Sequence, residues 1–373
     1  MKRVVLVLLA FVLASLPLAT PAQAQSPIPQ PCVDGTLPSG AKSRFCVPIG
    51  WNGQLVVFAH GYVPQGLPLS FTDTTLADGT SLPDVVQSLG FAFATTTYRQ
   101  NGLAIVEGLD DVRELIDAFK LAYTVPLRTY MTGASEGALV ATLLVEQSPE
   151  LFHSGLALCG PIGNFKSQID YIGDFRVLFD YYFPGLLPGS AVAVPPQLAL
   201  NWFTVYAPLV TAAVTANPAK TLELLRVAKA PYDPNQPATA LNTVLDLLRY
   251  NAFATTDATL KLGGNPYGNR TRWYFGSKND LLLNRSVARF SASPVALQSL
   301  QKYITAGELS IPLVTLHTTA DDIVPVTQEL QYLFKFDPSA RGRFLPLPVF
   351  RYGHCTFNLN EVVNAFGLML AQN

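Results

Sequence analysis

The sequence predicts an α/β fold in which a mostly parallel sheet is covered by helices on both faces. Short apolar runs alternate along the chain with longer segments of helical periodicity. The short runs are apolar throughout, as is typical of parallel strands buried on both faces. The segments between them are long enough to hold the crossover helix that joins two parallel strands.

The expected elements follow in a simple order. Strands are predicted at 55–59, 91–97, 129–131, 154–158, 312–317 and 346–351. Helices are predicted at 107–120, 136–146, 328–336 and from about 358 onward. The first helix repeats apolar residues at helical spacing, as in Leu109, Val112 and Ile116. The second is apolar almost all round, which indicates burial behind the sheet.

The alternation stops near Pro161 and resumes near residue 270. The stretch between them is rich in proline, aromatic residues and helical patterns, so we expect 161–269 to form an inserted cap on a core made of 25–160 and 270–373. The aromatic sequences Tyr181-Tyr182-Phe183 and Trp202-Phe203 could offer surface to a ligand or simply pack the cap.

The first residues have the layout of a secretory signal peptide. Lys2 and Arg3 precede an apolar run over 4–18, and Ala22-Gln23-Ala24 offers a small-residue cleavage site. We therefore predict cleavage near Ala24 and exclude 1–24 from the fold. No later apolar run is long and uninterrupted, so we expect a secreted or periplasmic protein without a stable membrane anchor.

The composition and charge of the chain limit the classes of partner that it can bind. The 373 residues carry a formal net charge of −1, only 14% are charged, and no basic run occurs. This argues against a nucleic-acid partner and favours an uncharged or apolar substrate. The cysteines have no zinc-site spacing, and neither a metal nor a cofactor is expected. The oligomeric state is left open.

The four cysteines of an exported chain predict two disulfides. Of the three possible pairings we expect Cys32 with Cys46 and Cys159 with Cys355. The first pair is close in sequence, before the core sheet. Cys159 ends a predicted strand and Cys355 follows a predicted strand, and parallel strands bring such ends to one edge. Two free buried thiols are the alternative for the second pair.

Gly133-Ala134-Ser135-Glu136-Gly137 matches the GxSxG nucleophile turn. The GxSxG pattern alone is weak evidence for a nucleophilic serine. Here it lies between a predicted strand and a predicted helix, as the motif requires. Ser135 is therefore the candidate nucleophile.

A serine nucleophile needs a histidine base and a carboxylate to orient it, in the chain order serine, acid, histidine. The chain has only four histidines, and His354 alone comes late enough, just after the last predicted strand. Asp321 follows the preceding strand and is the predicted acid. Its neighbour Asp322 and the upstream Asp280 are the alternatives. Asp280 would leave an extra strand, over 272–275, between acid and base.

Acyl transfer also needs hydrogen-bond donors for the oxyanion. We assign them to the backbone N–H of Glu136, after the nucleophile, and to that of Tyr62, in the loop after the early central strand. Gly61 lets that loop approach closely, and His60 is expected to brace it.

The segments HGY, GASEG, TTADDIVP and GHC, in this order, resemble the α/β-hydrolase superfamily over roughly residues 50–370. The resemblance implies a secreted esterase or lipase. His354-Cys355 also resembles tannases and feruloyl esterases, in which the cysteine after the histidine bonds one just before the serine. This chain has Ala134 at that position.

These observations predict a secreted serine hydrolase that cleaves an apolar ester, such as a lipid, aryl ester or polyester, through an acyl-enzyme. A peptidase of the same fold shares the triad and is the nearest alternative. Prolyl-oligopeptidase relatives usually carry a β-propeller, for which residues 25–54 leave no room. A binding protein that has lost activity is the third alternative, although no triad member is missing.

Overall fold

The centre of the molecule is a single eight-stranded sheet in a computed structural model that describes residues 26–337 and 340–372. Its strands are β1 (Val33–Thr36), β2 (Lys42–Cys46), β3 (Gln54–Ala59), β4 (Ala92–Thr96), β5 (Arg128–Ala134), β6 (Ser154–Leu158), β7 (Leu313–Ala320) and β8 (Phe344–Tyr352). They lie in the order β1-β2-β4-β3-β5-β6-β7-β8. β4 to β8 are parallel to β3, and only the hairpin β1–β2 runs antiparallel to its neighbours. The predicted mostly parallel sheet is confirmed.

The central strands are apolar because both faces of the sheet are covered. All of β4 and β6 is buried, as are five of the six residues of β3. Ala59 pairs with Gly133 and Ala134 pairs with Leu158, so β3, β5 and β6 end at one edge of the sheet. The loops that follow these strands therefore meet, as expected of a parallel α/β sheet.

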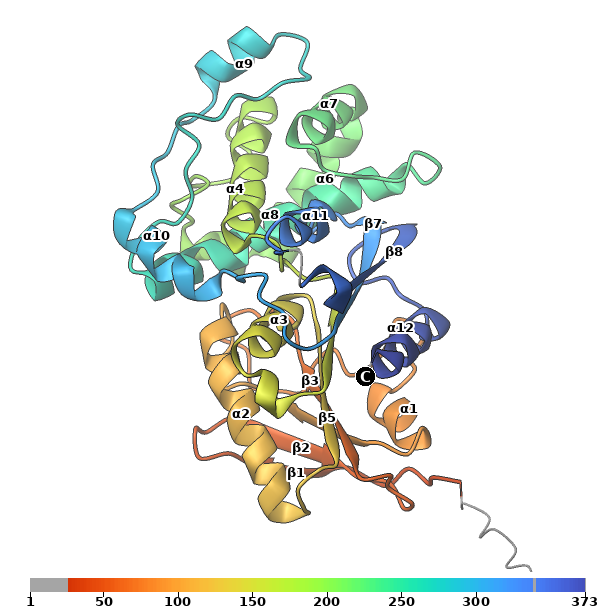
Figure 1. The fold of residues 1–373 in the computed structure, drawn as a ribbon. Helices are drawn as coiled ribbons and strands as arrows, with labels where there is room; N and C mark the ends of the chain where they lie inside the picture. The colour runs from red at the N-terminus through yellow and green to blue at the C-terminus, as the bar shows by residue number, and fades with distance from the viewer. Residues whose placement is uncertain (1–25, 338–339, 373) are drawn as a thin grey trace, which may run out of the picture.

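Helices of the core pack on the two faces of the sheet (Figure 1). They are α1 (Leu82–Ser88), α2 (Ile105–Ala122), α3 (Glu136–Gln147), α11 (Thr327–Leu333) and α12 (Leu359–Ala371), with short 3-10 turns at Pro149–Leu151, Leu300–Tyr303 and Arg341–Arg343. α2 and α3 contribute to the main hydrophobic cluster on one face. α12 closes the other face with Phe366 and Met369.

A helical insertion separates β6 from β7 and lies beyond the carboxyl edge of the sheet (Figure 1). It contains α4 (Phe165–Tyr182), α5 (Pro196–Leu200), a π-helical turn (Trp202–Tyr206), α6 (Ala207–Ala216), α7 (Pro218–Ala228), α8 (Ala238–Leu262), α9 (Asp280–Ser286) and α10 (Pro294–Ser299). Most of these helices share a hydrophobic cluster of their own, which also includes Tyr274 and Leu283. Trp202 is 2% exposed and belongs to it, so of the Trp202-Phe203 pair only Phe203, 69% exposed, faces outward.

Two parts of the chain differ from the sequence prediction. The possible strand at 272–275, considered in placing the acid, is absent, because Asn284 bonds to both backbone groups of Tyr274: its Oδ1 accepts the N–H and its Nδ2 donates to the carbonyl. The β1–β2 hairpin was not predicted, since β1 is fully exposed and lacks an apolar pattern. The disulfide between Cys32 and Cys46 ties this hairpin at its open end.

The predicted signal peptide over 1–24 lies outside the described residues. Within 26–337 and 340–372, none of the helices combines the length and the apolar character that crossing a bilayer requires.

Candidate active site

Ser135 forms the turn between β5 and α3, with φ 56° and ψ −121°. This is a costly conformation for a residue with a side chain, and the flanking glycines make it attainable. A Cβ at Gly133 would lie 2.1 Å from the carbonyl oxygen of Gly137, and a Cβ at Gly137 would lie 2.1 Å from that of Ala59. Both positions therefore require glycine. The turn projects Ser135 beyond the end of β5.

Ser135, His354 and Asp321 form one hydrogen-bonded row. Nε2 of His354 lies 2.8 Å from Oγ of Ser135, and Nδ1 of His354 lies 2.8 Å from Oδ2 of Asp321. The carboxylate accepts the Nδ1–H, which leaves Nε2 free to accept the proton of the hydroxyl group. The three residues follow β5, β8 and β7 at the same edge of the sheet. Their arrangement is that of a serine-hydrolase triad.

The carboxylate of Asp321 is fully buried and held from two sides. Its Oδ1 accepts the N–H groups of Ile323 and Val324 at 3.0 and 2.8 Å, while Oδ2 faces His354. These donors fix the carboxylate plane and partly replace the water lost on burial.

The two alternative aspartates have other partners. Asp322 accepts from the Tyr352 hydroxyl at 3.1 Å, and burial, together with the charges of Asp321 and Asp246, raises its pKa to about 6. Asp280 begins α9 and accepts from the N–H and hydroxyl of Ser277 at 2.8 and 2.6 Å. Within the described chain, Asp321 alone among the three hydrogen-bonds to His354.

The predicted oxyanion donors lie on either side of Ser135. A Cβ at Gly61 would approach the Cβ of Ser135 to 3.1 Å, so the loop after β3 passes directly beside the nucleophile. The N–H of Gly61 is occupied by Asp73 at 2.7 Å, whereas no acceptor for the N–H of Tyr62 is recorded in the described part of the chain. The N–H of Glu136 is in the first turn of α3, where helical N–H groups lack an intrahelical partner.

The loop that carries Tyr62 is braced by His60. The ring of His60 is buried, donates from Nδ1 to the carbonyl of Gly61 at 2.7 Å and stacks on Tyr98. The expected bracing role is therefore seen in the contacts of this residue.

The side chain of Glu136, whose significance the sequence did not reveal, is buried directly behind the nucleophile. Burial raises its pKa to about 8, although the N–H of Ala104 donates to its Oε1 at 2.9 Å. When the carboxyl of Glu136 is neutral, it places no negative charge behind the predicted oxyanion donors and so does not oppose an oxyanion there.

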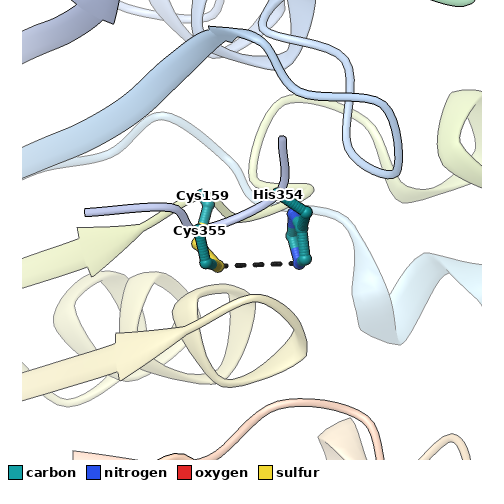
Figure 2. Close-up of side chains that lie close together, drawn as sticks. All are labelled: Cys159, His354 and Cys355. Atoms are coloured by element: carbon teal, nitrogen blue, oxygen red, sulfur yellow. Dashed lines mark hydrogen bonds between the residues drawn. A yellow bond between two sulfur atoms is a disulfide. The ribbon is translucent and has the colours of Figure 1, made fainter. Parts of the chain in front are cut away.

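The predicted disulfide between Cys159 and Cys355 is present beside His354 (Figure 2). It joins the end of β6 to the residue after His354, and both cysteines have positive φ, at 48° and 53°. Sγ of Cys355 lies 3.6 Å from Nε2 of His354. The potential ligand atoms of these three residues cluster within 4.8 Å. Because the two sulfurs are bonded to each other, the cluster offers no thiolate to a metal.

Two neighbouring cavities share Tyr62 and Tyr250 as lining residues. Ser135 and His354 line the first, of about 300 Å³. The second, of about 690 Å³, shares Tyr62 and Tyr250 with the first and extends beneath α8 and α5. Its wall is mainly apolar and includes Leu67, Val194, Pro195, Leu200, Phe203 and Phe253.

A third cavity, of about 480 Å³, opens on the other side of His354. Its lining is polar and apolar in about equal parts, and it includes Asp246, Arg249 and Asp322. Arg249 pairs with Asp246 at 3.1 Å.

Comparison with known proteins supports the fold. No family model matches the chain, and no curated protein matches it. Feruloyl esterase B from Aspergillus oryzae aligns with a TM-score of 0.51 at 15% identity, over 87% of this chain and 74% of that one. Esterase Pf2001 from Pyrococcus furiosus aligns at 0.48 and 12%, over 91% and 90%.

Acylaminoacyl peptidase from Pyrococcus horikoshii aligns with a TM-score of 0.47 at 11% identity, over 93% of this chain. The chain spans only 38% and 41% of two acylaminoacyl peptidase chains that it resembles. At these identities the likeness concerns the fold alone. The chain has the α/β-hydrolase fold, with a helical insertion between β6 and β7.

Proposed function

We propose that this protein is a serine hydrolase that cleaves carboxylic esters through an acyl-enzyme. The observation that carries the proposal is the row from Ser135 through His354 to Asp321, with both hydrogen bonds at 2.8 Å. A buried carboxylate fixes the tautomer of the histidine, and the histidine faces the serine hydroxyl. These are the elements of nucleophilic acyl transfer.

In the first half-reaction, His354 removes the proton of Ser135 as Oγ attacks the ester carbonyl. The N–H groups of Tyr62 and Glu136 donate to the oxyanion of the tetrahedral intermediate. The intermediate collapses, the alcohol departs with the proton held on Nε2 of His354, and the acyl group stays on Oγ.

In the second half-reaction, His354 removes a proton from water, which attacks the acyl-enzyme. Collapse of the second tetrahedral intermediate releases the carboxylic acid and returns the proton to Ser135. Asp321 stays ionised throughout and stabilises the imidazolium that forms in each half.

An apolar ester is the substrate class that the cavities favour. The wall of the 690 Å³ cavity is mainly apolar, and this cavity shares Tyr62 and Tyr250 with the cavity that Ser135 lines. An ester with an alkyl or aryl chain would bury that chain against this apolar wall, and the burial would strengthen its binding near the nucleophile. The cap role of 161–269 is part of this proposal, since α5 and α8 supply much of that wall.

A panel of esters tests the proposal. It contains p-nitrophenyl acyl esters of increasing chain length, a triglyceride, a hydroxycinnamate ester, a polyester and an aminoacyl amide. We expect turnover of the esters, with KM falling as the chain lengthens. Hydrolysis of the amide alone would contradict esterase function, and hydrolysis of nothing would favour a binding protein.

The apolar cavity can be tested within the same panel. Phe203→Ala should raise KM for a long-chain ester about tenfold and leave that for the acetate ester unchanged, because only the long chain reaches Phe203. Leu209→Ala is the matched control, since Leu209 is exposed on α6 but does not line this cavity.

A peptidase acting on substrates with a free amine is the second candidate. The 480 Å³ cavity beside His354 is lined by Asp246 and Asp322, whose carboxylates would attract an ammonium group. Arg249 already neutralises Asp246, which makes this the weaker candidate. Faster turnover of the aminoacyl amide than of the esters would favour it.

Export to an oxidising compartment is also part of the proposal. The two disulfides among the described residues are compatible with it, because disulfides persist outside the reducing cytosol.

A further inference from the structure

His317 lies in β7, four residues before Asp321, and its ring is buried directly behind the triad. The side chain is 1% exposed, and its Nε2 lies 3.6 Å from Oδ2 of Asp321. That same oxygen accepts the hydrogen bond from His354. The carboxylate of Asp321 therefore stands between two histidines.

Both ring nitrogens of His317 face hydrogen-bond acceptors. Nε2 lies 2.9 Å from the carbonyl oxygen of Val324, which cannot donate, so Nε2 carries a hydrogen. Nδ1 lies 3.0 Å from Oε1 of Glu329 on α11. The other oxygen of Glu329 accepts the hydroxyl of Thr315 at 2.6 Å, which leaves Oε1 to face Nδ1 of His317.

The surrounding charges favour a proton on each nitrogen. Burial alone would lower the pKa of His317, but the hydrogen bond and charge of Glu329 and the charge of Asp321 raise it above its ordinary value.

Within the described residues, the other elements packed against β7 bring no competing charge to His317. β6 has no ionisable side chain, Glu361 of α12 pairs with Arg351 at the surface, and α4 contributes neutral Gln168 and Tyr171, which donate to loop carbonyls. The carboxyl of Asp322 accepts from Tyr352.

We propose that His317 is a buried imidazolium that positions Asp321 from behind and extends the row to Glu329–His317–Asp321–His354–Ser135. Its role in turnover rests on the proposed function, because it acts through Asp321 and touches no substrate. Nε2–H of His317 donates to the carbonyl of Val324, and the N–H of Val324 donates to Oδ1 of Asp321. The positive charge also stabilises the buried carboxylate, which has no contact with bulk water.

The charge state can be measured without any substrate. The chain has only four histidines, so ring ¹⁵N spectra of protein labelled at histidine are simple to assign with His317→Gln. We expect the signal lost in that variant to come from a ring with both nitrogens protonated at neutral pH. A ring with one bare nitrogen would overturn the proposal. His153→Gln is the matched control, because His153 is exposed and lies before β6.

The pH profile of kcat/KM tests the positioning role. His317→Gln alone would leave Glu329 buried without its partner, so the double variant His317→Gln/Glu329→Gln, which removes both charges, is the better test. In the proposed row, the positive ring of His317 is nearer to His354 than the negative carboxylate of Glu329 is. Removing both charges therefore makes it easier to protonate His354 to its imidazolium form. The acid limb of the kcat/KM profile should therefore move to higher pH. On that limb, kcat/KM of the double variant should fall about threefold to tenfold more than it does on the plateau.

An acid limb that stays in place in the folded double variant would overturn the positioning role. His153→Gln should leave the profile unchanged. If wild-type protein hydrolyses none of the test esters, the proposed function fails while the ring spectra still decide the charge of His317. The two failures are therefore distinguishable.

Discussion

The sheet edge and the helical insertion specify their geometry in different ways. At the edge, backbone turns at the ends of three parallel strands place Ser135, Asp321 and His354, and glycines leave no alternative at Gly133 and Gly137. The insertion builds its own hydrophobic cluster. Under the proposed function, the edge carries the chemistry and the insertion controls substrate access.

Polar contacts join the insertion to the core at several places. Asp257 on α8 accepts the N–H of Leu103 at 2.5 Å, Tyr62 donates its hydroxyl to the carbonyl of Phe253 at 3.2 Å, and Tyr171 donates to the carbonyl of Asp322 at 2.9 Å. Substitutions at the edge should therefore reduce kcat for every substrate, whereas those in the insertion should change KM according to chain length.

The largest effect is expected at the nucleophile and the base. Ser135→Ala and His354→Ala should each reduce kcat by about 10⁶-fold with the fold intact, because neither proton transfer nor attack can occur. Ester turnover with circular dichroism as the fold control measures this. Near-normal turnover in the folded Ser135→Ala variant would end the site assignment.

The three aspartates provide the next test. Asp321→Asn should lower kcat by about 10⁴-fold, because an amide favours the wrong tautomer of His354. Asp322→Asn and Asp280→Asn have no bond to that ring and should cost less than about tenfold. A larger loss from Asp280→Asn than from Asp321→Asn would show that the acid is misplaced.

The two disulfides allow a matched comparison. Replacing either pair by serine should cost about 2–5 kcal/mol of folding free energy, because each constrains the unfolded chain. Only Cys159→Ser/Cys355→Ser should also reduce kcat, by a few fold, since that bond lies beside His354. Thermal unfolding and turnover of both double variants decide this. Equal kcat in the two would mean that the bond does not order the histidine loop.

The smallest effect concerns Glu136. Its pKa in the folded protein is raised to about 8, so its contribution to stability is fully present below the ordinary value of 4.5 and is lost as pH rises through 8. Glu136→Gln keeps an acceptor for the N–H of Ala104 and cannot ionise. At pH 9 the free energy of unfolding of the Glu136→Gln variant should be about 1–3 kcal/mol higher than that of wild type.

At pH 4 the two proteins should be nearly equal, and denaturant titrations at both pH values measure the difference. Glu150→Gln, at an exposed position, is the control and should match wild type throughout. A constant difference at both pH values would show that ionisation of Glu136 is not its cause.

The parts that the sequence predicts well are those in which local pattern and physical constraint coincide. Apolar runs predict β3 to β8 because burial on both faces demands them, and Gly133 and Gly137 mark the turn because no side chain fits there. The chain order of serine, acid and histidine then selects Asp321 and His354.

What the sequence missed depends on side chains that meet only in the folded chain. At 272–275, where a strand was possible, the backbone of Tyr274 instead bonds to Asn284, ten residues further along the chain. His317 directly precedes the TTADDIVP segment, but its significance comes from its contacts with Glu329 and Val324. The cavity shared by Tyr62 and Tyr250 joins loop and helix residues far apart in sequence, and no periodicity marks it.

The central claim is that Ser135 is an activated nucleophile, and covalent labelling tests it most directly. A fluorophosphonate reacts with a serine only where a base removes its proton and donors hold the phosphoryl oxygen. We expect one adduct per chain, located on Ser135 by peptide mass spectrometry, with labelling lost in Ser135→Ala and in His354→Ala. Folded wild-type protein that takes up no label, or takes it up at another serine, would contradict the account.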